Sequence, residues 1–276
     1  MTLRTPALAC DAENDGVPLR VAEISCLPPG VQADILKLAE REYGRNKADA
    51  AELASQIAAL YLSARDKNVL IIFNPGGWGW ATVEQMPLWA SILKGMKETL
   101  SGLGQRVMVV NYIRTPHSAG GALSEWLALA NLSRSKGREL AARVDFLTRH
   151  LPGLKVIIAG ESNGAARAED AMDFLRDNPR VFSVQTGTPF WAPSKPFERS
   201  LIINHNGAEA DSFSNGDVRR WFIANVQALF GRYKGSRGNV LLYIGAPGHV
   251  YNWDYPAVRE KIIRFLTGTV VTSKQY

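Results

Sequence analysis

From residue 68 onward, apolar and polar residues follow two alternating patterns. Short, nearly continuous apolar runs are typical of buried strands, and the longer segments between most of them carry apolar residues at the three- and four-residue spacing of amphipathic helices. The predicted strands are Val69 to Phe73, Val107 to Asn111, Lys155 to Ala159, Val181 to Gln185, Leu201 to Asn204 and Val240 to Ile244. The predicted helices are Val83 to Leu103, Lys136 to His150, Gly164 to Arg176, Asp217 to Tyr233 and Pro256 to Leu266.

Buried strands that alternate with helices predict an α/β fold with a mainly parallel, doubly wound sheet. The crossover helices of such a sheet pack on both of its faces, which explains why its strands are apolar on both sides. Ligands bind at the loops that leave the carboxyl ends of the strands. These loops are therefore the place to look for chemistry.

The first 66 residues follow a different pattern. Pro18 to Ser25 is a possible strand, while Val31 to Tyr43 and Ala48 to Ala64 are rich in good helix formers with helical apolar spacing. We divide the chain into an N-terminal extension (residues 1–66), with extra helices packed on the core, and an α/β core (residues 67–276).

Composition and charge narrow the function only slightly. The 276 residues, 46% of them apolar, suffice for one domain with a substantial core. A formal charge of +6 can attract nucleic acid, anionic lipid or an acidic substrate. The basic residues are dispersed among acids without a nucleic-acid-binding signature, so we interpret them as a solvated surface and expect no nucleic-acid partner. They include Arg134, Lys136, Arg138 and Arg143, and Arg219, Arg220, Arg232 and Lys234.

The two cysteines, Cys10 and Cys26, are too few for a disulfide framework and lack zinc-site spacing. No run approaches the 18 apolar residues of a membrane span, and the first residues lack the apolar core of a secretory signal. We expect a cytoplasmic protein, although a secreted chain without its leader would look the same.

The segment Gly160-Glu161-Ser162-Asn163-Gly164 lies directly between a predicted strand and a predicted helix. A turn this tight requires small residues two positions before and after the serine, and it places the serine at the positive end of the helix. The segment resembles the nucleophile elbow of the α/β-hydrolase family. The alternative is an ordinary glycine-rich turn or a phosphate site, but neither a Gly-x-Gly-x-x-Gly pattern nor a lysine-containing phosphate loop occurs here.

A serine hydroxyl needs a base to take its proton. In the family the serine, the acid and the histidine follow in that order, with the histidine after the last strand. The resemblance therefore implies that His249 is the base. His117 and His205 lie at strand ends, and each could line the pocket. His150 lies at the C-terminus of a helix, where the helix dipole favours a positive charge.

The acid is expected soon after the strand Leu201 to Asn204. Asp211 is our prediction, and Glu209 stays open because a one-residue error in the strand end changes which carboxylate reaches the imidazole. Asp217 and Asp254 lie just before helices, where a carboxylate stabilises the N-terminus of the helix.

The loop from Phe73 to Trp80 carries two adjacent glycines and follows the first predicted strand of the core. The resemblance implies an oxyanion hole from the amide of Gly77 or Trp78 together with that of Asn163. Asn74 stands where many relatives have histidine, so the residue of this loop that donates to the oxyanion is not fixed by the resemblance. The alternative is an ordinary glycine turn without a catalytic role.

Aromatic residues on the same loops are candidates for binding an apolar substrate group. Burial in the core is an equal alternative for them. The candidates are Trp78, Trp80, Phe190, Trp191, Phe213 and Tyr251. Only the short loop Gly187 to Arg199 follows the strand after the elbow, so we expect no large cap domain and a rather open cleft.

The resemblance implies a serine hydrolase, with Ser162, His249 and Asp211 as the catalytic residues, that cleaves a small-molecule ester through an acyl-enzyme. It calls for no metal and no organic cofactor. Two alternatives remain: a thioesterase, amidase or acyltransferase on the same residues, and a non-catalytic binding protein. The oligomeric state cannot be read from the sequence.

Overall fold

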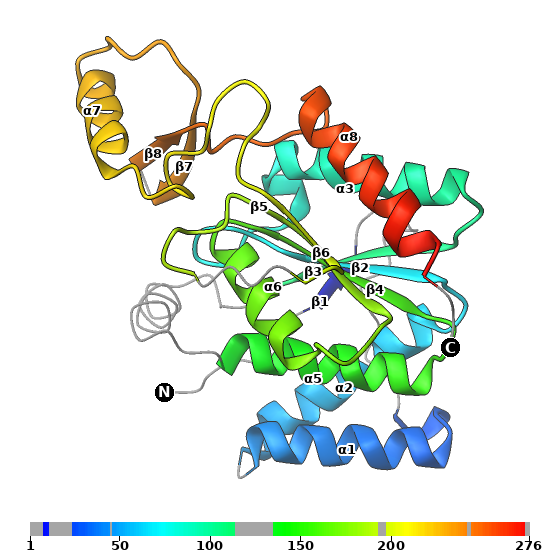
Figure 1. Cartoon of the computed structure of the whole chain (residues 1–276). Helices are drawn as coiled ribbons and strands as arrows, with labels where there is room; N and C mark the ends of the chain where they lie inside the picture. Colours follow the sequence, from blue (N-terminus) through cyan, green and yellow to red (C-terminus); the bar gives the residue numbers. More distant parts are fainter. Residues whose placement is uncertain are drawn as a thin grey trace.

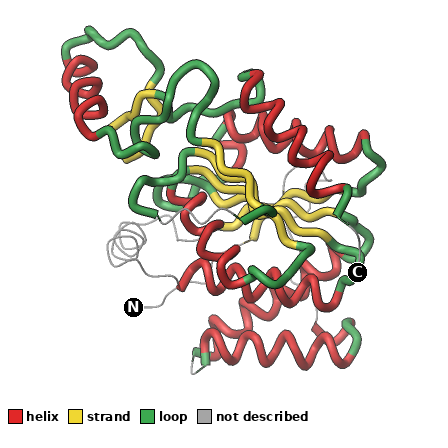
Figure 2. The backbone as a smooth tube through the Cα atoms, viewed as in Figure 1, coloured by secondary structure: helices red, strands yellow, loops and turns green. Residues whose placement is uncertain are grey.

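The structure, a computed structural model, describes residues 8–10, 24–44, 46–113, 135–192, 197–241 and 244–273. Its central sheet has the strand order β1-β3-β2-β4-β5-β6 (Figures 1 and 2). The strands β2 to β6 pair in parallel, and β1 pairs antiparallel with β3. The bounds are β1 Leu8–Cys10, β2 Val69–Asn74, β3 Val107–Tyr112, β4 Lys155–Glu161, β5 Val181–Thr186 and β6 Ser200–Ile203.

Helices cover both faces of this sheet, which confirms the predicted doubly wound α/β fold. In Figure 1, α3 and α8 lie on one face, and α5 and α6 lie on the other with α1 and α2 beyond them. The bounds are α1 Pro29–Tyr43, α2 Lys47–Ala64, α3 Pro87–Gly102, α5 Ser135–His150, α6 Asn163–Phe174, α7 Val218–Leu229 and α8 Pro256–Phe265. The predicted helix Val83 to Leu103 is divided into two helices. A short 3-10 helix, Val83–Gln85, comes first, and α3 begins at Pro87, a residue that is common at the first position of a helix.

The alternation of side chains along β2 explains the two cores. Leu70 and Ile72 point to the face with α1, α2, α5 and α6, whereas Val69, Ile71 and Phe73 point to the face with α3 and α8. All five are fully buried. Successive residues of a strand point to opposite faces, so a strand covered on both sides must be apolar throughout.

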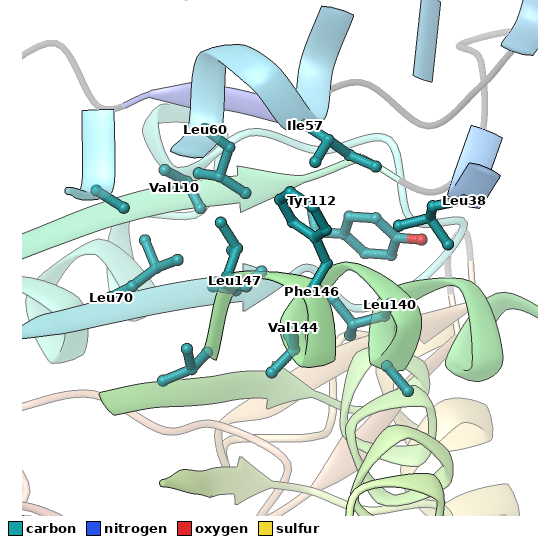
Figure 3. Packing of buried hydrophobic residues seen from close by; sticks show 14 of the residues in the cluster. Leu38, Ile57, Leu60, Leu70, Val110, Tyr112, Leu140, Val144, Phe146 and Leu147 are labelled. Carbon is teal, nitrogen blue, oxygen red and sulfur yellow. The ribbon is translucent and has the colours of Figure 1, made fainter. Parts of the chain in front are cut away.

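The helices α1 and α2 share a hydrophobic core with the sheet. Figure 3 shows Leu38 of α1 and Ile57 and Leu60 of α2 beside Tyr112 of β3 and Phe146 of α5. The part of the extension that the structure describes therefore packs on the core. The division of the chain at residue 66 stays a prediction.

One of the predicted strands, Val240 to Ile244, is wrong as a part of the main sheet. The segment Val240 to Ile244 is divided between β7, Arg237–Leu241, and β8, Ile244–Pro247, which pair antiparallel as a separate sheet with an irregular register. These strands pack with α7 in a small lobe, which we call the α7 lobe (Figure 1). The apolar run was correct as a strand signal, but a run of five residues does not say which sheet it joins.

The possible strand Pro18 to Ser25 lies mainly outside the described residues, and its end begins a 3-10 helix, Ile24–Cys26. The strand β1, which lies earlier in the chain, was not predicted. Within the described parts of the chain, no helix combines the length and the apolar character needed to cross a membrane.

The packing of α1 can be tested with two adjacent residues. Ile35 is fully buried and Leu36 is 53% exposed. We expect Ile35→Ala to lower the free energy of unfolding by about 2–4 kcal/mol through lost apolar burial and a cavity. Leu36→Ala should stay within about 0.5 kcal/mol of the parent protein. Urea unfolding measures both, and equal effects would contradict the packing of α1 described above.

Candidate active site

The site lies where the order of the parallel strands reverses. After β2 the chain crosses to β3 on one side, and β4 then pairs with β2 on its other side. The loops that leave β2 and β4 therefore diverge to opposite faces and open a crevice at the carboxyl edge of the sheet. The glycine-rich loop follows β2, and Ser162 follows β4.

Ser162 has φ 51° and ψ −121°, and among the described residues other than glycine it alone has a positive φ. Such a backbone conformation costs on the order of 1–3 kcal/mol and persists only where the surroundings enforce it. The serine is the N-cap of α6, so its side chain lies at the positive end of that helix.

Close packing around Gly160 and Gly164 enforces the turn. A Cβ at Gly160 would lie 2.6 Å from the carbonyl oxygen of Gly164. A Cβ at Gly164 would collide with the carbonyl oxygen of Asn74 at the end of β2. Both positions therefore require glycine, as the sequence pattern predicted.

His249 lies on the loop between β8 and α8, buried beside Asp211. Its Nδ1 lies 2.6 Å from Oδ2 of Asp211, and both side chains are at most 2% exposed. Asp211 follows β6 after a short bridge between His205 and Ala210. A histidine held at Nδ1 by a carboxylate presents Nε2 as a proton acceptor.

The Asp211 carboxylate is held by further donors besides His249. Oδ2 accepts hydrogen bonds from the Tyr251 hydroxyl at 2.7 Å and the Ser214 hydroxyl at 3.0 Å. Oδ1 accepts from the backbone N–H groups of Phe213 at 2.9 Å and Ser214 at 3.1 Å. Burial opposes ionisation, but the hydrogen bonds from His249, Tyr251 and Ser214 and the charge of His249 outweigh it and lower the pKa of Asp211. The carboxylate is therefore a stable anion beside the imidazole.

Ser162 and His249 line one pocket of about 600 Å³, which is a volume suited to a small organic ligand. Within the described ranges, neither the Ser162 hydroxyl nor Nε2 of His249 has a hydrogen-bond partner, although both atoms are buried. Two buried, unpaired groups in one pocket, one of them a nucleophile and the other a base, need an explanation. One explanation is that the hydroxyl and Nε2 form their hydrogen bond only when substrate is bound.

The loop after β2 forms one wall of the pocket. Gly77 and Gly79 have φ values of 55° and 77°, which only glycine adopts without strain. The side-chain amide of Asn163 donates a hydrogen bond to the carbonyl oxygen of Gly77 at 3.1 Å. This bond joins the loop to the first residue of α6, so the amides of Gly77, Trp78 and Asn163 lie on segments that contact each other.

The predicted aromatic residues separate into two groups. Trp78 and Trp80 line the pocket, with their ring centroids 6.1 Å apart. The other four do not line it. Phe213 is buried against His249 and contacts the partly exposed Phe190 and Trp191, and Tyr251 donates its hydrogen bond to Asp211.

The other titratable candidates lie elsewhere. Glu209 forms an ion pair with Arg220, and Asp217 caps α7 by accepting a hydrogen bond from the Arg220 N–H at 3.0 Å. His150 contacts Asp34 of α1 at 3.1 Å, and His205 accepts from the N–H of Gly207 at 2.8 Å. His117 lies outside the described residues. Among the residues that the structure describes, no group of His, Cys, Asp and Glu is arranged to hold a metal ion.

Glu161, which precedes the serine and lines the pocket with it, was not predicted from the sequence as a site residue. Burial raises the pKa of Glu161 to about 7, the charge of His249 opposes this rise, and that of Asp211 adds to it. A carboxyl group that titrates near neutrality beside a candidate nucleophile marks a functional site. The only sequence signal was its place next to Ser162, and that place alone does not reveal burial.

The α7 lobe completes the pocket from a third side. Gly238, Asn239 and Val240 of β7 line it, and a side chain at Gly238 would collide with the backbone carbonyl of His249. The strand β7 therefore lies directly against the histidine. The remaining lining residues belong to the loop between β2 and α3 and to the start of α3, including Met86, Leu88 and Trp89.

The parallel sheet with helices on both faces and the strand–serine–helix turn define an α/β-hydrolase fold. No protein-family model and no curated protein matches the sequence. Among solved structures, the chain is similar to Trichoderma reesei cutinase in complex with a C11Y4 phosphonate inhibitor, with 16% sequence identity and a TM-score of 0.44. The match covers 89% of this chain and 94% of that chain. The chemistry of this protein has to be inferred from its own residues.

The raised pKa of Glu161 predicts a pH-dependent stability. Below its ordinary pKa of 4.5 the group is protonated in both states, and as pH rises to about 7 the unfolded chain loses this proton before the folded chain does. This difference destabilises the folded protein progressively over that interval. Glu161→Gln removes the effect, so its stability advantage over the parent protein should grow by about 1–3 kcal/mol between pH 4.5 and about pH 8.

Urea unfolding at the two pH values measures this change. Glu260→Gln, which alters an exposed carboxyl group of α8, is the matched control and should show no such growth. A constant difference between Glu161→Gln and the parent protein would exclude the raised pKa.

Proposed function

We propose that this protein is a serine hydrolase that cleaves carboxylic esters through an acyl-enzyme. The observation that carries the proposal is the buried Asp211–His249 pair, whose unpaired Nε2 shares a pocket with the unpaired hydroxyl of Ser162. A base oriented by an acid and a nucleophile on a strained turn are the parts that acyl transfer requires.

In the proposed reaction, the Ser162 oxygen attacks the ester carbonyl carbon while Nε2 of His249 takes the hydroxyl proton. Asp211 stabilises the imidazolium that forms. The imidazolium then protonates the leaving alcohol, and the carbon–oxygen bond to that alcohol breaks to give the acyl-enzyme. His249 next takes a proton from water, whose oxygen attacks the acyl carbon. The imidazolium then gives this proton to the Ser162 oxygen as the bond between that oxygen and the acyl carbon breaks, which releases the acid and the free serine.

The negative charge on the carbonyl oxygen needs hydrogen-bond donors, and we assign them to the amide of Asn163 and to that of Gly77 or Trp78. The N-terminus of α6 supports this assignment, because its first amides lack partners within the helix and its dipole favours an anion. Loss of one such donor costs about 3 kcal/mol of transition-state stabilisation in comparable enzymes.

The pocket favours an apolar acyl or alcohol group. Trp78, Trp80, Met86, Leu88 and Trp89 supply most of its apolar lining on the side of the β2–α3 loop. Apolar groups that leave water on binding contribute about 25 cal/mol per Å² of buried surface. Glu161 is the acidic group beside the reacting serine, so the substrate portion nearest to it should be neutral or positively charged.

The role of Ser162 can be tested with a fluorophosphonate probe and a panel of aryl esters, thioesters and anilides. We expect the probe to label the parent protein and Ser101→Ala, an exposed control in α3, but not Ser162→Ala. Ester hydrolysis should fall by about 10³-fold or more in Ser162→Ala. If the parent protein is not labelled, the proposal of a serine hydrolase is contradicted and the alternative of a non-catalytic binding protein is favoured. If it is labelled but prefers thioesters or anilides, the substrate class is wrong.

Tyr251 offers a test of the acid. Tyr251→Phe removes one of the donors that stabilise the Asp211 anion. A hydrogen bond to a charged group contributes about 1.5–3 kcal/mol, so kcat for a good ester should fall about tenfold while KM stays nearly constant. Tyr61→Phe in α2 is the control. A raised KM with unchanged kcat would instead place Tyr251 in substrate binding.

A further inference from the structure

The helix α7 presents an apolar surface to solvent. Phe222 is 69% exposed, Leu229 is 84% exposed and Phe230 is 71% exposed. We call this surface the outer face of α7, and it comprises Val218, Phe222, Ile223, Val226, Leu229 and Phe230. Contiguous exposed apolar side chains of this kind mark an interaction site on a soluble protein.

The opposite side of α7 is fixed to the lobe by small and polar groups. Ala224 is buried, and the side-chain amide of Asn225 donates to the carbonyl oxygen of Gly245 at 2.8 Å and accepts from the Gly245 N–H at 3.0 Å. Trp221 packs against the buried Phe213. The helix is thus held with its large apolar side chains directed outward, and a rotation that buried them would break these hydrogen bonds.

The stretch of chain that carries the apolar surface is positively charged. Residues 217–241 contain five basic residues and one acidic residue, so this stretch carries four of the six net positive charges of the chain. Arg219, Arg232 and Lys234 are exposed, and no described carboxylate forms an ion pair with any of them. The occupant of this surface should therefore combine an apolar phase with negative charge.

We propose that the outer face of α7 docks on an anionic phospholipid surface. Its apolar side chains would enter the boundary of the acyl chains, and its basic residues would contact the anionic headgroups. A second copy of this chain is the less favourable occupant. In a symmetric dimer the same surface meets itself, which would bring the two positively charged stretches together.

The α7 lobe connects the proposed docking surface with the pocket. The chain leads from α7 directly into β7, and Gly238, Asn239 and Val240 of β7 line the pocket beside His249. In Figure 1, α7 lies at the far end of this lobe from the central sheet. Docking through α7 would bring the wall of the pocket close to the lipid surface. The proposal itself does not depend on hydrolase activity.

Co-sedimentation with vesicles tests it. We expect the parent protein to bind phosphatidylcholine vesicles that contain about 30% phosphatidylglycerol at least about tenfold more tightly than pure phosphatidylcholine vesicles. Phe222→Ser/Leu229→Ser should weaken binding to the anionic vesicles at least about tenfold. Arg232→Ser/Lys234→Ser should weaken it by about fivefold per removed charge.

The matched control is Leu36→Ser/Leu103→Ser, which alters two exposed leucines outside the lobe and should leave binding unchanged. Circular dichroism and the hydrolysis of a soluble ester by each variant separate a loss of docking from a loss of folding. The proposal is overturned if the parent protein binds neither vesicle or if the control loses as much binding as Phe222→Ser/Leu229→Ser. It is also overturned if light scattering finds a dimer that Phe222→Ser/Leu229→Ser dissociates.

Discussion

The contact between the serine turn and the end of β2 is the constraint on which the site depends. Gly164 at the start of α6 lies against the carbonyl oxygen of Asn74, and Gly160 lies against the backbone of Gly164. Neither contact leaves room for a side chain. The turn therefore cannot relax, and Ser162 is held in a conformation that a serine in an open loop would leave. The reversal of strand order between β2 and β4 places the glycine-rich loop beside this turn.

The second half of the site is built differently. Asp211 and His249 come from loops outside the parallel sheet, and their positions depend on hydrogen bonds instead of strand pairing. The carboxylate is surrounded by donors from Phe213, Ser214, Tyr251 and His249, which keep a buried charge stable. A buried anion without these partners would be protonated. The polar network and the rigid turn thus meet in one pocket from two directions.

The α7 lobe connects this pocket with the surface of the molecule. One of its strands forms a wall beside His249, and its helix carries the most exposed large apolar side chain of the described residues, Leu229. A helix that packs on a hydrophobic core through its apolar face buries that face. Here the inner side is formed by Ala224 and Asn225 instead, which leaves the large side chains available for a partner.

The sequence alone predicted the parallel sheet with helices on both faces, the strand–Ser162–helix turn and the place of His249 before the last helix. Strands, helices and tight turns depend on residues that are neighbours in the chain, so their patterns can be read directly. The separate sheet of β7 and β8 could not be predicted, because a short apolar run does not identify its pairing partner.

Only the tertiary structure decided that Asp211 and not Glu209 contacts His249, that Tyr251 donates to Asp211, and that Glu161 lines the pocket. It also decided that α7 directs its apolar face outward, whereas the sequence pattern of an amphipathic helix predicts a buried one. Each of these outcomes depends on which loops meet in space. The direction of a side chain and the pKa of a carboxyl group follow from neighbours that are distant in the sequence, and a local pattern contains no information about them.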